Sequence, residues 1–94
     1  RERLWSNVRL AADLFPRGVN VSSPIVPVIL GSEERALAAA ATLLDAGFHV
    51  PAVRPPTVPA GTSRLRVTLT AAHTEAEIRA LATVLRLAVG TRSD

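Results

Sequence analysis

Arginine is the residue type in this sequence whose placement most clearly suggests chemistry. Arg64 and Arg66 alternate with apolar residues, so both side chains are expected on the same face of a β-strand. Arg54 stands at the end of an earlier predicted strand, just before a proline-rich loop. A guanidinium binds a carboxylate through two parallel hydrogen bonds, which fixes the orientation of the acid. The three arginines are therefore candidates for binding an anion; the alternative is that they only solvate an open sheet face.

The loop over residues 55–63, Pro-Pro-Thr-Val-Pro-Ala-Gly-Thr-Ser, is the second candidate feature. Prolines preset backbone angles, so ordering this loop against a ligand costs less conformational entropy than ordering a Gly/Ser loop. Thr57 lies within the loop and offers a hydroxyl group. We therefore expect a stiff rim beside the strand that carries the arginines.

Other kinds of site find little support in the sequence. His49 and His73 have no carboxylate or third ligand spaced to join them, so we expect no metal site. No Ser-His-Asp order and no glycine-framed nucleophile is present. All 11 basic residues are arginines, and without a lysine no Schiff base can form between this chain and a carbonyl cofactor. We therefore expect no catalytic and no cofactor-binding residue within the chain.

Composition narrows the class of protein. The chain has 94 residues and a formal net charge of +3, which is a weak basis for nucleic-acid binding. No apolar run reaches the roughly 18–20 residues that span a bilayer, and the start of the chain lacks the features of a signal peptide. The absence of cysteine is compatible with a reducing compartment, so we expect a cytoplasmic protein. Trp5, Phe15 and Phe48 are expected in the core.

Hydrophobic periodicity and turn residues predict a single α+β domain over residues 1–94. Its two layers are a small sheet of about three strands, mixed or antiparallel, and helices packed on one face of it. Because the first helix starts abruptly with charged residues, we expect the natural protein to extend upstream. The predicted elements are a helix over 1–15, a strand over 25–30, a helix over 33–46, a strand over 48–53, the loop over 55–63, a strand over 64–70 and a helix over 75–89.

Several single residues predict where these elements begin and end. Pro27 cannot donate to a strand ladder, which places its strand at an edge or at a bulge. Ser32 is the expected N-cap of the second helix, and Gly47 follows its last turn. Thr74 and Glu77 form a capping box at the start of the last helix, and Gly90 is expected to close that helix.

Three stretches resemble the α-oxoamine synthases, which are pyridoxal-phosphate-dependent enzymes of fold type I. They are RPPTVP at 54–59, GTSRLRVT at 61–68 and AAHT at 71–74, and the resemblance extends from residue 23 through the last helix. It implies that the chain is the small C-terminal domain of a homodimeric enzyme whose large domain, absent here, binds pyridoxal phosphate. It also implies a reaction in which a cofactor-bound amino acid attacks an acyl thioester and carbon dioxide is lost.

The resemblance further assigns substrate-binding roles to three residues. Arg66 matches the family's clamp for the amino-acid carboxylate, Thr57 matches a loop residue that contacts substrate, and Arg54 matches an arginine near the acyl substrate. The Arg-Pro-Pro-Thr start of the loop points to the branch that joins L-alanine to a pimeloyl thioester. The alternatives are a branch that uses glycine, as in glycine C-acetyltransferase or 5-aminolevulinate synthase, or a stand-alone anion-binding regulatory module. The chain alone is expected to be inactive, without nucleic-acid or membrane partners.

Overall fold

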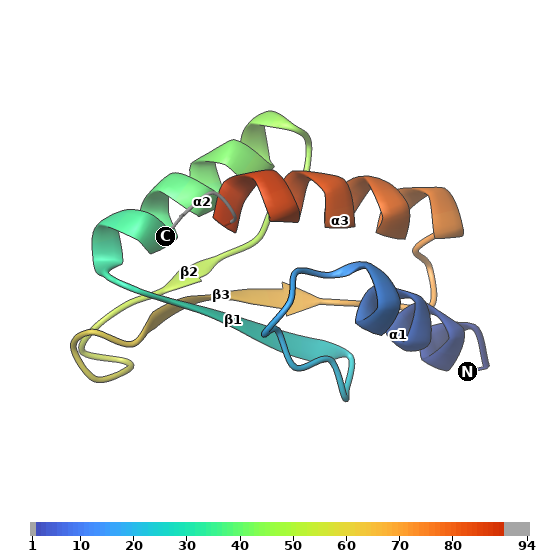
Figure 1. Cartoon of the computed structure of the whole chain (residues 1–94), viewed down its shortest axis with the longest axis horizontal. Helices are drawn as coiled ribbons and strands as arrows, with labels where there is room; N and C mark the ends of the chain where they lie inside the picture. Colours follow the sequence, from blue (N-terminus) through green and yellow to red (C-terminus); the bar gives the residue numbers. More distant parts are fainter. Residues whose placement is uncertain (1, 90–94) are drawn as a thin grey trace.

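The computed structural model describes residues 2–89, which form three helices and one three-stranded sheet (Figure 1). This confirms the α+β class that the sequence predicts. Among the described residues, no helix combines the length and apolar character needed to cross a bilayer. The elements are α1 (Glu2–Leu14), β1 (Ile25–Gly31), α2 (Glu33–Asp45), β2 (Ala52–Val53), β3 (Ser63–Thr68) and α3 (Glu75–Val89).

The sheet is antiparallel, and β3 is its central strand in the order β1-β3-β2. β1 is therefore an edge strand, as Pro27 predicts, and Pro27 lies opposite Arg66 in the register. The register shifts between Ile29 and Gly31, so the irregularity lies beyond the proline. Pro27 is tolerated because the strand pairs on one side alone.

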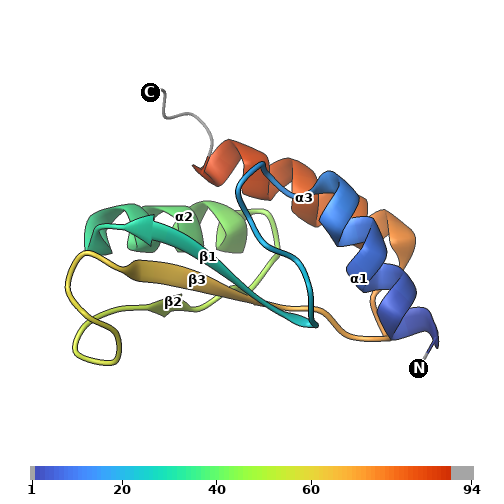
Figure 2. The same ribbon diagram turned by 60° about the horizontal axis from the view of Figure 1, so that its bottom comes forward.

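The helices form the second layer of the molecule. α2 lies over one face of the sheet and contacts all three strands, while α3 packs beside α2 and α1 packs against α3 (Figure 2). The inward residues of β3 are almost completely buried, with Leu65 and Val67 at 0% and 1% exposure. Small aliphatic side chains between the layers form the core: Val8, Ala11, Val26, Val28, Ala36, Ala39, Leu43, Ile78, Leu81, Ala82 and Leu85.

The second strand is shorter than the predicted range of 48–53, because β2 contains only Ala52–Val53. The backbone N–H of Phe48 still donates to a carbonyl of α2 at 2.8 Å, so this residue completes the end of the helix. Pro51 has no N–H to donate, although its carbonyl accepts from the backbone N–H of Arg66 at 3.0 Å. Pairing between the two strands therefore fades out on the N-terminal side of β2.

The third strand ends at Thr68, before the predicted end at residue 70. The backbone N–H of Thr70 donates to the ring Nδ1 of His73 at 3.0 Å, which turns the chain toward α3. The predicted alternation holds, because Leu65, Val67 and Leu69 are buried. A side-chain hydrogen bond thus takes the place of the ladder at this end.

The predicted caps are confirmed. The hydroxyl of Ser32 accepts from the backbone N–H of Arg35 at 3.1 Å. Thr74 and Glu77 bond reciprocally, at 2.8 Å and 3.1 Å, and begin α3. Gly47 follows α2 with a φ of +96°, a backbone conformation that residues other than glycine rarely adopt. The glycine at position 90, expected to close α3, lies outside the described residues.

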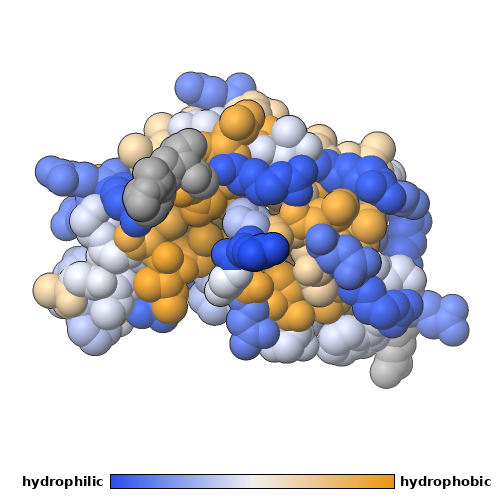
Figure 3. All heavy atoms as spheres, viewed as in Figure 1, coloured by the Kyte–Doolittle hydropathy of each residue, from blue (hydrophilic) through white to orange (hydrophobic). Residues whose placement is uncertain are grey.

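The aromatic residues do not all lie in the core as expected. Phe15 is buried and Phe48 packs against the core, but the side chain of Trp5 is 45% exposed. Trp5 lines a surface hollow with Glu2, Ser6 and Arg9, so its ring is not part of the core. Figure 3 shows apolar surface reaching solvent between rows of hydrophilic side chains on one side of the molecule.

Candidate functional site

The three residues predicted to bind substrate line a single hollow of about 460 Å³. Arg54 and Thr57 belong to the segment 51–57, which leads from β2 into the proline loop, and Arg66 comes from the middle of β3. The remaining lining is largely proline, alanine and valine, so the polar groups of these three side chains stand out against apolar walls. The structure therefore brings Arg66 close to Arg54 and Thr57, although the proline loop and the start of β3 separate them in the sequence.

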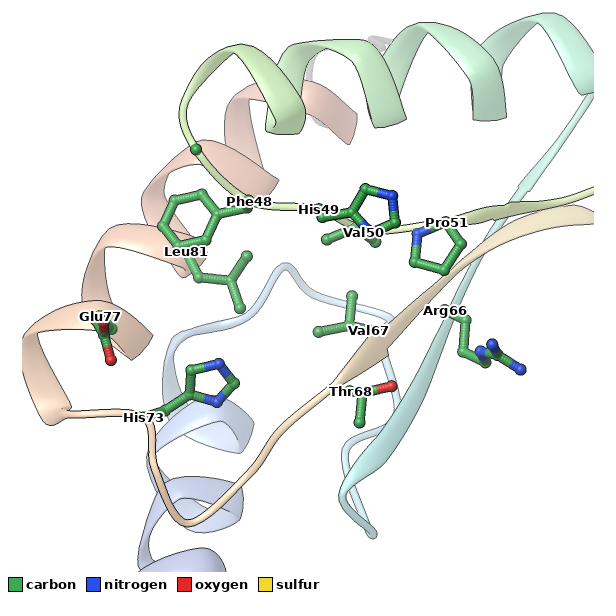
Figure 4. Close-up of a pocket in the computed structure, with 11 residues that line it drawn as sticks. Phe48, His49, Val50, Pro51, Arg66, Val67, Thr68, His73, Glu77 and Leu81 are labelled. Carbon is green, nitrogen blue, oxygen red and sulfur yellow. The ribbon is translucent and has the colours of Figure 1, made fainter.

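Arg66 is exposed and makes no ion pair or side-chain hydrogen bond with any residue in the 2–89 range. Figure 4 shows its side chain directed away from Phe48 and His73. Arg64 differs, because its Nε donates to the carbonyl of Thr62 at 3.0 Å. Alternation along the strand makes the two arginines equivalent, whereas in the structure Arg64 has one side-chain donor committed to the loop and Arg66 has none committed to a described residue.

Arg54 is already paired within the chain. Its Nη1 lies 2.7 Å from Oε2 of Glu33, and the two side chains are 46% and 50% exposed. Sequence reasoning missed Glu33 as a site residue, because an acid in the first turn of a helix is sufficiently explained by the helix dipole. No local signal connects positions that lie 21 residues apart.

Hydrogen bonds at both ends hold the proline loop in place. The backbone N–H of Thr57 donates to the carbonyl of Arg54 at 3.0 Å, which closes a turn at the start of the loop. At the other end, the backbone N–H and the hydroxyl of Thr62 both donate to the carbonyl of Pro59, at 3.1 Å and 2.6 Å. Thr57 is exposed, and its hydroxyl bonds to no other described residue. The loop thus presents one uncommitted hydroxyl group on a braced backbone.

A second hollow, of about 260 Å³, lies along the part of β3 that β2 leaves unpaired (Figure 4). His49, His73 and Glu77 all line it, although their sequence spacing gave no reason to group them. Nδ1 of His73 accepts from the backbone of Thr70, and Glu77 accepts from the backbone of Thr74. Within residues 2–89, no group of three or more His, Cys, Asp or Glu side chains could hold a metal ion.

The sheet face opposite α2 extends the first hollow into a broader surface. Ile25 and Ile29 of β1 are 57% and 61% exposed on it. They lie opposite Thr68 and Arg64 in the register, and residues opposite each other in an antiparallel pair share a face. This open face therefore combines an apolar edge with a basic central row, and Arg66 lies in that row.

Sequence and structure comparisons identify what the chain is related to. It is 64% identical over 82 residues to 8-amino-7-oxononanoate synthase from Anaeromyxobacter dehalogenans (strain 2CP-C), covering 83% of this chain and 21% of that protein. It is 48% identical over 85 residues to the enzyme of the same name from Arabidopsis thaliana, covering 90% of this chain and 17% of that protein. No protein-family model matches the chain.

Comparison with solved structures also gives matches over nearly the whole chain. A structure of SPT with PLP superposes with a TM-score of 0.82 at 40% identity, covering 94% of this chain and 24% of that chain. Serine palmitoyltransferase from Sphingomonas wittichii gives a TM-score of 0.81 at 34% identity, covering 94% and 24%. The chain belongs to the α-oxoamine synthase family. It spans about a fifth of the length of the curated relatives that it matches.

Family membership raises the question whether this part of an α-oxoamine synthase holds pyridoxal phosphate. Covalent attachment of that cofactor to a protein requires a primary amine, and the chain contains no lysine. The first hollow instead offers guanidinium groups and a hydroxyl, which suit a carboxylate. The residues present do not fit the cofactor's attachment, and they fit an anionic substrate group.

Proposed function

We propose that this chain is the small C-terminal domain of an 8-amino-7-oxononanoate synthase, a cytoplasmic homodimer of biotin biosynthesis. In this proposal, the rest of the polypeptide binds pyridoxal phosphate, and the enzyme joins L-alanine to a pimeloyl thioester with loss of carbon dioxide. The identities of 64% and 48% to enzymes of that name support the proposal. The observation that carries it is the guanidinium of Arg66 on the open sheet face, beside a braced loop, with no ion-pair partner in the described part of the chain.

Arg66 binds and orients the carboxylate of L-alanine. Two parallel hydrogen bonds from one guanidinium fix both the position and the rotation of the acid. A fixed carboxylate also fixes the directions of the other bonds at the α carbon, so geometry decides which of them breaks. Arg66 is an orienting residue in this scheme, and no proton passes through it, because an arginine side chain stays protonated in proteins.

Thr57 and Arg54 form the other walls of the same hollow. Thr57 contributes a hydroxyl that can donate to or accept from a substrate, at a position fixed by the turn to Arg54. Arg54 lies on the side toward α2, where its ion pair restrains it, and we place it next to the acyl substrate. The apolar edge of β1 is where we expect the large domain to cover the sheet.

Substituting Arg66 by Ala in the full-length enzyme tests the proposal. We expect kcat/KM for L-alanine to fall about 10- to 150-fold, the equivalent of roughly 1.5–3 kcal/mol for a hydrogen bond to a charged group. The KM for the acyl thioester should change little. Arg64→Ala is the matched control, since it removes a guanidinium from the same strand face and should leave kcat/KM for L-alanine within about twofold.

Equal losses in the two variants would contradict the assignment of Arg66, because they would reflect the charge of the face rather than one contact. The same assay with glycine or L-serine in place of L-alanine separates this proposal from other members of the family. A preference for either would move the chain to another branch.

A further inference from the structure

The two arginines that line the first hollow are not equivalent. Arg66 makes no ion pair with any described residue, whereas Nη1 of Arg54 lies 2.7 Å from the carboxylate of Glu33. An anion entering the hollow meets, on β3, a guanidinium that pairs with no residue from 2 to 89. At Arg54, which also lines the hollow, it meets a guanidinium whose charge is already partly compensated by Glu33.

The backbone on both sides of this ion pair is well anchored. Glu33 is the first residue of α2, directly after the N-cap Ser32, whose hydroxyl bonds into the first turn. Arg54 follows β2, and its carbonyl accepts from Thr57 at 3.0 Å. The pair therefore connects the helix layer to the start of the proline loop. The hollow itself is lined by Arg54 and not by Glu33.

We propose that Glu33 is a positioning residue that masks the charge of Arg54. The mask leaves Arg66 as the guanidinium that takes the amino-acid carboxylate. The ion pair also restrains Arg54, so an anionic part of the acyl thioester binds Arg54 only in competition with Glu33. This inference rests on the proposed function for its consequence in catalysis, but the ion pair and the mask can be tested without any turnover.

The expected size of the effect follows from exposure. Both side chains are about half exposed, so water screens their attraction and the mask is partial. Ion pairs of this kind change an equilibrium by about two- to fivefold. A partial mask suits a residue that must hold Arg54 in place and still release it to a substrate.

Chemical modification of arginine tests the mask directly. The full-length protein, without substrate, is treated with phenylglyoxal, and the rate of modification at each arginine is followed by peptide mass mapping. In the wild type, we expect Arg66 to react faster than Arg54. Glu33→Gln should raise the rate at Arg54 about two- to fivefold and leave Arg66 unchanged.

Glu34→Gln is the matched control. Glu34 is the next residue of the same helix turn and makes no ion pair with a described residue, so this variant loses the same charge near the helix N-terminus. It should not alter the rate at Arg54. An unchanged rate at Arg54 in Glu33→Gln, or an equal increase in Glu34→Gln, would overturn the mask.

Steady-state kinetics tests the consequence for substrates. Because Glu33→Gln frees Arg54 for an external anion, we expect the KM for the acyl thioester to fall about two- to fivefold and to depend more steeply on salt. The kcat and the KM for L-alanine should stay within experimental error. A rise in the KM for the thioester in Glu33→Gln would overturn the masking role. If instead the wild-type enzyme does not turn over L-alanine and the thioester, the proposed function is overturned, and the modification result is unaffected.

Discussion

Asn7 is the buried polar side chain that joins α1 to the rest of the molecule. It is 5% exposed, and its Nδ2 donates to the carbonyls of Thr70 and His73, at 2.9 Å and 3.0 Å. These carbonyls lie in the turn between β3 and α3, which His73 also holds through its ring. One amide group therefore satisfies two acceptors in the turn that follows the arginine strand.

Replacing Asn7 by Ala should destabilise the protein by about 1–3 kcal/mol, because two partly buried carbonyls would each lose the shorter of their two donor contacts and keep only one at 3.3 Å. Urea unfolding of the two proteins measures the difference. Ser6→Ala, on the exposed side of the same helix, is the control and should change stability by less than about 0.5 kcal/mol. Similar values for both variants would show that water replaces the amide at no cost.

For single residues, the sequence predicts which face of a strand a side chain occupies better than it predicts which atoms that side chain contacts. Alternation identified Arg64 and Arg66 as neighbours on one face, and the structure confirms this. The pattern had no means to show that the carbonyl of Thr62 engages one of them, or that Glu33 engages Arg54. Such contacts depend on how a loop folds back in three dimensions, which periodicity does not encode.

Among the elements, those with strong periodicity and explicit caps were predicted closely. α3 begins where the capping box of Thr74 and Glu77 places it, because reciprocal bonds satisfy two N–H groups that a helix start leaves without partners. The strand predicted over 48–53 was reduced to Ala52–Val53. Its apolar composition suits a strand, but the end of α2 and the missing N–H of Pro51 remove ladder bonds that composition does not report.

Substituting Thr74 by Ala tests the cap of α3. We expect a loss of about 0.5–2 kcal/mol in the free energy of unfolding, since the N–H of Glu77 loses its acceptor. Chemical denaturation followed by circular dichroism measures it. Thr83→Ala, within the same helix, should be neutral or slightly stabilising, because alanine has the higher helix propensity and the exposed hydroxyl of Thr83 donates to the backbone carbonyl of Arg79 in its own helix. A cost for Thr83→Ala equal to that for Thr74→Ala would argue against a specific capping effect.

The whole molecule has one sheet face covered by helices and one face open. α2 and α3 bury the inward residues of β3 and β1, and this layer arrangement was predictable because alternating strands need one cover. The composition of the open face was not predictable in detail, since it depends on the register between β1 and β3. That register aligns Ile25 and Ile29 with Thr68 and Arg64, producing an apolar edge beside the basic row.

The chain spans about a fifth of the length of its curated relatives, so the open face has a candidate cover in the rest of a longer polypeptide. Replacing Ile25 and Ile29 together by Thr distinguishes a face that is covered there from one that stays in water. At 57% and 61% exposure, these side chains contribute little to the core, so urea unfolding of the 94-residue chain should change by less than about 0.5 kcal/mol. In the full-length protein, burial against a second domain should make the same double substitution cost about 1–3 kcal/mol, because threonine would bring two hydroxyls into an apolar contact. Equal effects in the two proteins would mean that the rest of the polypeptide leaves this edge exposed, which would weaken the proposed role of Arg66 in a covered site.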